Sequence, residues 1–538
     1  MLSTLNYRSH SIRLHPQNSV HRKMHVDSWC EQCGNRTVSS ASRYFPKRED
    51  FPFMTTSDIV QKLWNLCDVL RDDGINYSDY VTELVLLLFI KMEHENLESG
   101  VIKAPLLPEY ARWNQLRGLS GINLLNTYRR TLQQLSESTS PRIAAVYANA
   151  QTSLSEPRHL EQLIRDLDRI DWFDTDKDGL GDLYEGLLEK NASETKSGAG
   201  QYFTPRPLID AMITVMRPQV GETIQDPAAG TAGFLIAADR AIRAQTDDLL
   251  DLTELQRAFQ IRKAYTGMEL VPNTRRLALM NCLLHGIEGD QEGAIHLGNT
   301  LGTAGQRLPK SDIILSNPPF GTAKGGGGAT RDDLTHPTSN KQLAFVQHIV
   351  KHLKDGGRAA VVLPDNVLFE VGVGADIRRA LMDKCRLHTI LRLPTGIFYA
   401  QGVKTNVLFF EKVGEAANGS TKEVWVYDMR ANAPKFGKRT PLTGAHFAEF
   451  IAAYGEDVNG NSPRSYSGEQ SRWRCFSREW IRDEKQDSLD IAWLKDDSVE
   501  DAADLPEPAV LAREITDELN AALEELEGIL AELGGQIE

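Results

Sequence analysis

The chain has 538 residues, of which 41% are hydrophobic and 25% are charged, and this composition predicts a globular protein of two or three domains. Its formal net charge of −14 excludes a general electrostatic attraction to nucleic acid, because affinity for a polyanion comes mostly from Lys and Arg. If the chain acts on DNA, we expect basic residues concentrated on one face and another subunit that does most of the binding.

Cysteine content and hydropathy exclude two further classes of protein. Six cysteines in a chain of this length do not form a disulfide framework, so we expect a reducing cytoplasm. The most apolar run, residues 84–90, is far shorter than the roughly 20 residues that cross a bilayer, and it predicts a buried helix instead. The sequence therefore predicts a soluble protein that does not enter the membrane.

Residues 1–53 differ from the rest of the chain. They are rich in His, Arg and Ser and show neither helical nor strand periodicity. Cys30 and Cys33, with His21 and His25 upstream, suggest a zinc site, but this spacing is not that of a recognised zinc finger. We predict a disordered or non-native extension upstream of Met54, with metal or partner binding as the alternative.

Residues 54–190 predict an all-helical domain that packs but carries no chemistry. Ile59, Leu63 and Leu70 recur at helical spacing, and Thr56 and Ser57 are candidate caps of this first helix. Further helices are predicted at residues 81–92, 124–135, 141–147 and 160–170.

Residues 174–179 imitate the start of a calcium-binding loop, because three aspartates alternate with other residues before a glycine. Glu185 even stands where the bidentate carboxylate would be expected. However, residues 182–190 already predict a helix. We therefore interpret the segment as structural and expect no metal.

Residues 226–234, with the sequence DPAAGTAGF, lie between a short strand at residues 223–225 and a helix that begins near Leu235. Strand, small-residue turn and helix is the sequence form of a loop that holds a nucleotide, and Gly230 and Gly233 let its backbone approach the ligand. The alternative is a turn that only closes an α/β unit.

Two polar positions follow the next strands of the predicted sheet. Glu269 ends the strand that begins at Tyr265, where a carboxylate can accept both hydroxyls of a ribose. Asn299 follows the third strand, within residues 298–301, and can accept a hydrogen bond through its amide oxygen without contributing charge.

The turn Asn317-Pro318-Pro319-Phe320 follows the apolar strand at residues 313–315. Two prolines hold the Asn317 amide oxygen and the Pro318 carbonyl in a stiff turn, so two acceptors stand side by side. These acceptors suit an exocyclic NH2 group, whose lone pair they would direct at an electrophile. Phe320 would stack on an extruded base, although a plain loop after a strand remains the alternative.

After a glycine-rich loop, which we expect to become ordered on substrate, further apolar runs complete the predicted sheet. Strands near Thr223, Tyr265, Ala294 and Asp312 and at residues 359–363, 389–393 and 406–410 alternate with helices. They predict an α/β fold with a doubly wound, seven-stranded sheet.

In this order and separation, the motifs resemble the modification (methyltransferase) subunit of type I restriction-modification systems, over residues 54–412. The matching segments are residues 54–92, 180–185, 200–205, 226–234, 298–301, 316–320 and 357–364. The resemblance implies a Rossmann-like fold dependent on S-adenosylmethionine, with DNA adenine N6 as the methyl acceptor.

The resemblance also implies residue roles. Residues 201–205 would help to close the methyl-donor pocket, or Pro205 would only begin a helix near its N1 position. The catalytic candidates are Asn317, Pro318, Pro319 and Phe320, and the candidates for binding S-adenosylmethionine are Gln201, Tyr202, Phe203, Thr204, Pro205, Asp226, Ala228, Gly230, Thr231, Gly233, Phe234, Glu269, Asn299, Thr300 and Leu301.

Alternatives to adenine N6 follow from the same turn, which presents its acceptors to any planar NH2 group. Methylation of cytosine N4, of RNA adenine or of a glutamine amide uses these acceptors equally well. A chain without activity, serving as a scaffold or DNA-binding subunit, is the alternative from another class.

The C-terminal region, residues 441–538, predicts a partner surface. Arg464, Arg474 and Arg478 lie among aromatic residues and either line a nucleic-acid surface or form a mixed one. Residues 519–537 place Leu and Ile at four-three spacing among acidic neighbours, which predicts a helix with an apolar seam. By the resemblance, such helices meet a specificity subunit flanked by two copies of this chain, and a restriction subunit completes the enzyme.

The domain boundaries predicted from these patterns are residues 1–53, 54–190, 191–440 and 441–538. Because the first segment has no core pattern, a chain that starts at Met54 should equal the full-length protein in melting temperature and methylation. Calorimetry and a methylation assay on the two proteins test this. Loss of bound zinc together with loss of folding would contradict it.

Overall fold

The helices at the beginning of the described chain start from a capping box. The structure, a computed structural model, describes residues 55–494 except 76–78, 171, 173–179, 195–202, 322–330, 399–402, 415–418, 435, 438–439 and 467. Helix α1, Thr56–Asn65, has Thr55 as its N-cap, and the Thr55 and Asp58 side chains each accept the other residue's backbone N–H. The predicted caps Thr56 and Ser57 are therefore wrong by one or two positions, because only Thr55 has an acidic residue three positions later.

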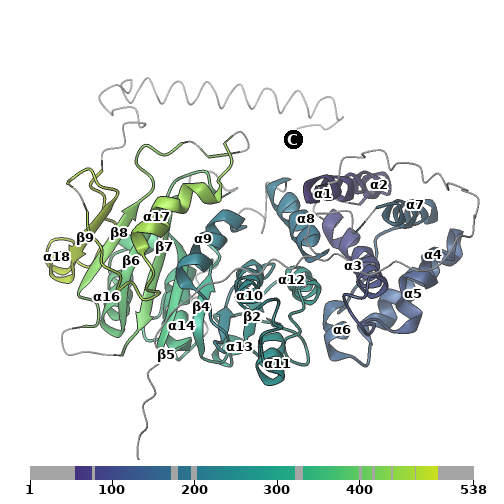
Figure 1. The fold of residues 1–538 in the computed structure, drawn as a ribbon, viewed down its shortest axis with the longest axis horizontal. Coiled ribbons are helices and arrows are strands. Elements are labelled where there is room, and N and C mark those ends of the chain that lie inside the picture. Colours follow the sequence, from purple (N-terminus) through teal and green to yellow (C-terminus); the bar gives the residue numbers. More distant parts are fainter. Residues whose placement is uncertain are drawn as a thin grey trace, which may run out of the picture. The chain divides into compact units, whose positions relative to one another are not determined.

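The predicted helices of residues 54–190 are confirmed. They are α1, α2 (Cys67–Asp72), α3 (Tyr80–Glu98), α4 (Trp113–Arg117), α5 (Gly121–Ser136), α6 (Pro141–Val146), α7 (Pro157–Asp168) and α8 (Leu180–Glu194), with a short 3-10 turn, η2, at Glu109–Ala111 (Figure 1). Helix α3 is buried on nearly all sides. Its Glu83 accepts hydrogen bonds from Thr152 and Ser153, and its Lys91 pairs with Asp168 at 2.7 Å, so its buried charges are satisfied.

The predicted doubly wound sheet is confirmed, and two strands extend it beyond the seven expected. The strands are β1 (Ile224–Asp226), β2 (Tyr265–Glu269), β3 (Ile295–Leu297), β4 (Ser311–Ser316), β5 (Leu353–Pro364), β6 (Cys385–Leu393), β7 (Thr405–Lys412), β8 (Glu423–Asp428) and β9 (Trp473–Ser477). Their order is β3-β2-β1-β4-β5-β7-β6-β8-β9. Strand β1 pairs in parallel with β2 and β4, and β7 runs antiparallel between β5 and β6.

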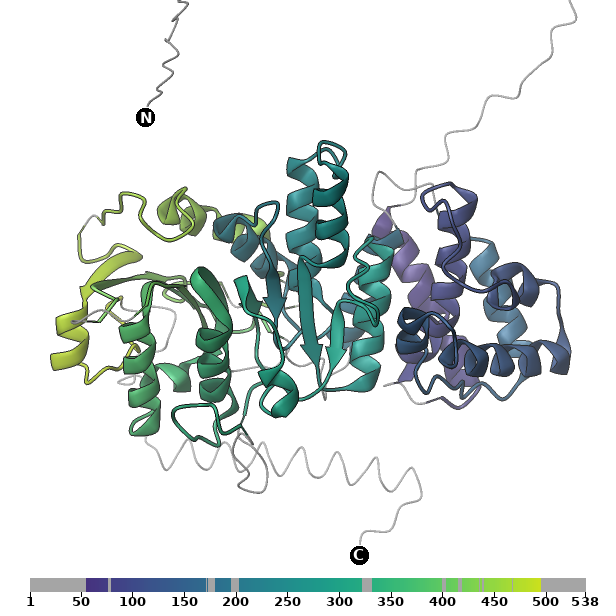
Figure 2. The same ribbon diagram turned by 90° about the horizontal axis from the view of Figure 1, so that it is seen from below.

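Helices cover both faces of this sheet. They are α9 (Arg206–Met216), α10 (Gly233–Gln245), α11 (Glu254–Arg262), α12 (Pro272–Leu284), α13 (Thr303–Gln306), α14 (Lys341–His352), α15 (Asp365–Phe369), α16 (Val373–Lys384), α17 (Ala448–Tyr454) and α18 (Arg478–Asp483), with a 3-10 turn, η4, at Gly444–Phe447. Ala360 and Val362 of β5 pack into the hydrophobic cluster of α9 and α10, whereas Ala359 and Val361 pack into that of α14 and α16. Alternate residues of β5 thus serve two cores. Figure 2 shows helices on both sides of the sheet.

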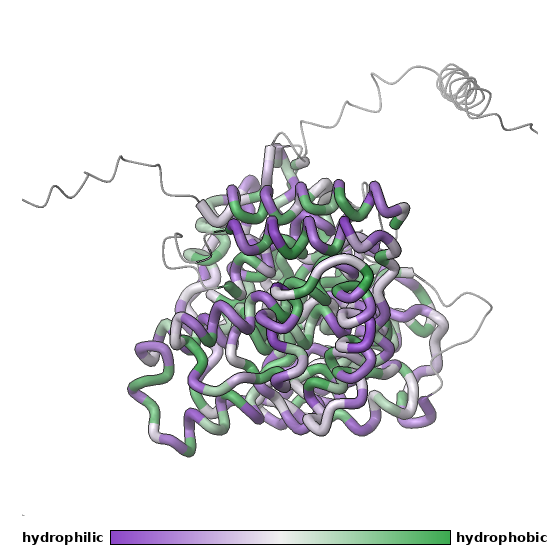
Figure 3. The backbone as a smooth tube through the Cα atoms, turned by 90° about the vertical axis from the view of Figure 1, so that its right-hand side faces the viewer, coloured by the Kyte–Doolittle hydropathy of each residue, from purple (hydrophilic) through white to green (hydrophobic). Residues whose placement is uncertain are grey.

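Hydrophobic and hydrophilic residues alternate along the helices in Figure 3, as expected for helices with one buried face. None of the helices within the described part of the chain is long and apolar enough to cross a membrane.

Helix α12 joins the sheet to the helices that precede it. Arg276 donates to the carbonyls of Val146 at 3.1 Å and Ala148 at 2.8 Å, and the Tyr184 hydroxyl donates to the carbonyl of Leu277. The cluster that contains α9 and α10 also contains the buried side chains of α1 to α8. One continuous hydrophobic core therefore holds the early helices and one face of the sheet.

The arginines of the C-terminal region hold that region to the sheet. The guanidinium of Arg464 lies over the rings of Tyr454 and Trp473, and Arg478 pairs with Asp487 at 2.7 Å. Both side chains therefore contact other residues of the protein itself. This favours a mixed surface over a nucleic-acid surface in this segment. The predicted helix at residues 519–537 and the segment 1–53 lie outside the described residues.

Candidate active site

A cavity of about 690 Å³ opens at the carboxyl edge of the sheet. Because β1, β2 and β4 are parallel neighbours, Asp226, Glu269 and Asn317 all reach this edge. Of the predicted residues, those that line the cavity are Phe203, Thr204, Asp226, Ala228, Gly230, Thr231, Gly233, Phe234, Glu269, Asn299, Thr300, Leu301, Asn317 and Pro319.

Asp226 joins the loop that follows β1, residues 226–234, to the turn that follows β4. Its Oδ1 atom accepts from the backbone N–H of Ala228 at 3.0 Å and from the Ser316 hydroxyl at 2.8 Å, so the loop after β1 is bound to the end of β4. The residue is 1% exposed, and burial raises the pKa of its carboxyl group to about 7, although both hydrogen bonds act in the opposite direction.

The loop after Asp226 turns sharply into α10. Gly230 and Ala232 both have left-handed backbone conformations, with φ of 53° and 69°, and Ala232 is the N-cap of the helix. A non-glycine residue in this conformation is uncommon; Ala232 adopts it fully buried, with its backbone N–H donating to the Ala229 carbonyl at 2.7 Å. A side chain at Gly233 would meet Ile209 of α9, so glycine allows the close packing of α9 on α10.

Glu269 faces the cavity from the end of β2. Its Oε2 atom accepts from the backbone N–H of Gly230 at 3.0 Å, and its Oε1 atom accepts from that of Val271 at 2.8 Å. These bonds fix the carboxylate against the loop, while each oxygen keeps a second lone pair. Burial raises the pKa of this group above its ordinary value, and both hydrogen bonds oppose the shift.

Asn299 and Thr300 close the cavity beside the loop. The Asn299 amide oxygen accepts from the backbone N–H of Leu301 at 2.9 Å, which forms a local turn. The Thr300 hydroxyl donates to the Pro227 carbonyl at 2.5 Å and so ties this turn to the first loop.

The Asn317 amide is oriented by Thr204, because its Nδ2 atom donates to the Thr204 hydroxyl at 3.0 Å. The Pro319 carbonyl accepts from Gln342 at 2.8 Å, which holds the turn against α14. Pro318 is buried and is not among the lining residues. Phe320 is half-buried and packs edge-on against Phe398, also outside the lining set.

The segment before α9 is divided between cavity and scaffold. Gln201 and Tyr202 lie outside the described residues. Phe203 and Thr204 line the cavity, whereas Pro205 is the N-cap of α9 rather than its N1 residue and does not line it.

A second group of lining residues was not predicted from the sequence. From α8 come Leu188, Asn191 and Ala192, from the segment before α14 come Thr338 and Ser339, and from the first turns of α14 come Lys341, Ala344 and Phe345. The only local signal was Asn340, whose side chain caps α14 by accepting from Leu343. Residues 180–185 of α8 carry part of the family resemblance, but no local pattern marks Leu188, Asn191 or Ala192 as lining residues, because they lie far from the loops along the chain.

A doubly wound sheet with a cofactor-sized cavity at its carboxyl edge, and an Asn-Pro-Pro-Phe turn on the rim of that cavity, defines a DNA amino-methyltransferase. Comparison with known families agrees: residues 175–481 match the model described as N-6 DNA Methylase, and residues 59–167 match the HsdM N-terminal domain.

Two curated relatives cover nearly the whole chain. It is 55% identical to the type I restriction enzyme StySPI methylase subunit of Salmonella potsdam, over 89% of this chain and 96% of the relative. It is 54% identical to the EcoKI methylase subunit of Escherichia coli, over 90% and 97%. A crystal structure of the EcoKI M protein matches 89% of this chain and 97% of that chain, with a TM-score of 0.54 and 50% identity.

The chain belongs to the methylase subunits of type I restriction enzymes, within the N-6 DNA methylase family. It is an adenine-specific DNA methyltransferase and one component of a larger restriction-modification enzyme.

The raised pKa of Asp226 predicts a pH dependence of stability. Between the ordinary value of 3.8 and about 7, the folded chain keeps a proton that the unfolded chain releases, so this contribution to stability is present below pH 3.8 and is lost as the pH rises through 7. Asp226→Asn lacks this titration. Relative to the parent, it should gain stability on the order of a few kcal/mol across this window.

Urea unfolding of the two proteins from pH 4 to 8, without methyl donor, measures the difference. Ser316→Ala removes a hydrogen bond that lowers the pKa, so it should move the upper end of the window to higher pH. Parallel stability curves for the parent and Asp226→Asn would show that this carboxyl group does not titrate as described.

Proposed function

We propose that the cavity binds S-adenosylmethionine and that Asn317 positions the adenine amine that receives the methyl group. The donor molecule carries adenine, ribose hydroxyls and a positive sulfonium. Two carboxyl groups with raised pKa values, the buried Asp226 and the half-buried Glu269, both line the cavity and favour a cationic ligand with hydroxyl groups, and the cavity volume suits a molecule of this size. This charge pattern is the observation that carries the proposal.

In the proposed arrangement, the loop from Asp226 to Phe234, here called the donor loop, and Glu269 hold the ribose and amino-acid part of the donor. Asn299, Thr300 and Leu301 border its adenine, and Phe203 and Thr204 close the cavity from the side of α9. Gln201, Tyr202 and Pro205 complete the proposed set. When bound, S-adenosylmethionine supplies an activated methyl group.

The protein contributes orientation and polarisation at the acceptor nitrogen. Thr204 binds the Nδ2 atom of Asn317, which orients the amide oxygen together with the Pro318 carbonyl in the rigid turn. These two acceptors would draw the hydrogens of the adenine amine and localise its lone pair, an interaction stronger in the transition state than in the ground state. No metal is needed for this step.

Phe320 would hold the flipped adenine by stacking. Its ring is half-buried and supported from the side by Phe398, so it offers a fixed aromatic face. The same acceptors would suit cytosine N4, an RNA adenine or a glutamine amide, but membership of the adenine-methylating family favours DNA adenine.

We further propose that two copies of this chain flank one specificity subunit, and that a restriction subunit joins them. The relatives' names describe subunits of type I restriction enzymes, and a solved structure that is 25% identical, with a TM-score of 0.65, concerns complex assembly of a type I system. Because the chain has a net charge of −14, we expect that a partner subunit provides most of the affinity for DNA. We retain residues 54–190, 191–440 and 441–538 as the proposed domains, with the first boundary falling within the last turn of α8, Leu180–Glu194.

Asn317→Ala tests the catalytic assignment. Removing one acceptor should lower the methylation rate by at least about 100-fold, as for other preorganised polar groups that act on a transition state, and leave donor affinity within about twofold. Calorimetric titration with S-adenosylmethionine and a single-turnover methylation assay measure the two effects. Equal methylation rates in the variant and the parent would contradict the proposed mechanism.

Deletion of residues 511–538 tests the proposed partner helix. If its Leu and Ile side chains bind the specificity subunit, the truncated chain should bind donor normally but lose subunit association and site-specific methylation together. Co-purification and methylation of a defined site measure this. If the purified chain alone modified that site with the preference of the complex, the proposed division of labour would have to be abandoned.

A further inference from the structure

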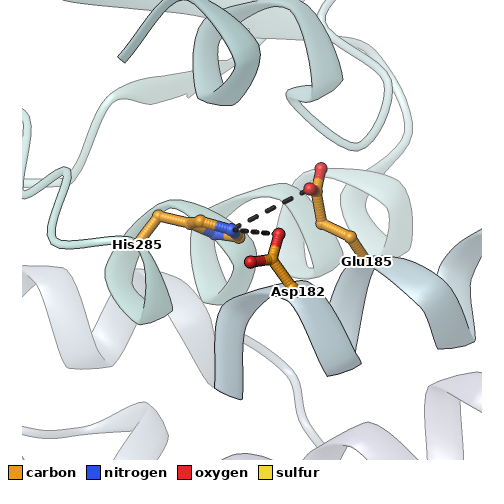
Figure 4. A group of neighbouring side chains, drawn as sticks. All are labelled: Asp182, Glu185 and His285. Atoms are coloured by element: carbon orange, nitrogen blue, oxygen red, sulfur yellow. Dashed lines mark ion pairs between the residues drawn. The ribbon is translucent and has the colours of Figure 1, made fainter. Parts of the chain in front are cut away.

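Behind the cavity, Glu185 of α8 forms the centre of a buried charged cluster. The residue is only 6% exposed. Its carboxylate accepts from Arg206 of α9 and, at 3.1 Å, from Arg240 of α10. The Asn281 amide of α12 lies at 3.5 Å, and His285 Nε2 lies 3.9 Å from both Glu185 and Asp182 (Figure 4).

Asp182, Glu185 and His285 resemble a set of metal ligands, but the cluster already contains its own cations. Arg240 bonds to both carboxylates, and Arg206 bonds to Glu185. A metal ion held by these carboxylates would therefore face both guanidinium groups at close range. The cluster is therefore an ion-pair network rather than a metal centre.

Each partner of Glu185 belongs to an element that builds the cavity. Arg206 is the first residue of α9 and lies two positions after Thr204, which orients the Asn317 amide. Arg240 lies on α10, the helix that begins at the donor loop. Asn281 donates at 3.0 Å to the carbonyl of Thr231, within that loop.

Helix α8 contributes both to this cluster and to the wall of the cavity. Leu188 and Ala192 follow Glu185 at helical spacings of three and seven, so the three residues share one face of α8, and both apolar side chains line the cavity. On the far side α8 packs against α1, where a side chain at Gly186 would meet Val60 at 2.8 Å. The position of α8 is therefore set by close packing on one side and by Glu185 on the other.

We propose that Glu185 is a positioning residue for methyl transfer. Through Asn281 and Arg240 it holds the donor loop, and through Arg206 it holds the segment that orients Asn317. The inference rests on the proposed function, namely that S-adenosylmethionine binds in this cavity.

Glu185→Gln keeps the shape of the side chain and removes its charge, and Glu83→Gln is the matched control. Glu83 is also 6% exposed and hydrogen-bonded, but its partners Thr152 and Ser153 do not line the cavity. In the complex with the specificity subunit, Glu185→Gln should weaken binding of S-adenosylmethionine by at least about tenfold, as expected for lost charge-assisted hydrogen bonds. Glu83→Gln should change donor affinity less than twofold, even if it lowers the melting temperature as much as Glu185→Gln does.

Two variants at more exposed positions separate the connection through Arg206 from the connection through Arg240. They also test the proposal if Glu185→Gln does not fold. Arg206→Gln should lower kcat more than donor affinity, because it acts through Thr204 on Asn317. Arg240→Gln should weaken donor affinity with a smaller effect on kcat. The side chains of Arg206 and Arg240 are 26% and 41% exposed, and after either replacement the other arginine still bonds to the buried Glu185 carboxylate.

Donor affinity and kcat of Glu185→Gln within twofold of the parent would overturn the proposal. So would an equal loss of donor affinity in Glu83→Gln, since Glu185 would then contribute only to stability. Failure of the parent protein to bind S-adenosylmethionine would instead overturn the proposed function, which keeps the two failures distinct.

Discussion

The hydrogen bond between the Asp226 carboxyl and the Ser316 hydroxyl joins the two halves of the proposed active site. Asp226 ends β1 and Ser316 ends β4, and the residues after them form the donor loop and the Asn-Pro-Pro-Phe turn. Because the strands are parallel neighbours, both turns leave the sheet at the same edge. This constraint sets a cofactor cavity directly beside the residue that would polarise the acceptor base.

The electrostatics of the site follow from the same arrangement. Asp226 and Glu269 accept hydrogen bonds from backbone N–H groups and a hydroxyl, all of them neutral, and burial raises the pKa values of both carboxyl groups. Two arginines are engaged one layer further back, around Glu185. These arginines thus stabilise the scaffold behind the cavity, while Asp226, Glu269 and Lys341 are charged or titratable side chains that line it.

Several features of the fold were predicted wrongly or not at all, because the local sequence pattern fits more than one structure. Thr55 rather than Thr56 or Ser57 caps the first helix, because the capping box needs Asp58 three positions later. Strands β8 and β9 were not expected, and β9 is a half-exposed edge strand whose apolar alternation is weak. Arginines among aromatic residues suggested a nucleic-acid surface, yet Arg464 stacks on Tyr454 and Trp473 of the protein itself.

The sequence by itself determined the class of fold, the seven strands of the central sheet and the two motifs at its edge. These features are local: apolar runs, small-residue turns and successive prolines restrict the backbone wherever they occur. Only the tertiary structure decided that Leu188 and Ala192 of α8 and Phe345 of α14 complete the cavity, and that Glu185 holds the surrounding helices. Such contacts join residues far apart in the chain, and they depend on how whole helices pack against the sheet, which no pattern of neighbouring residues specifies.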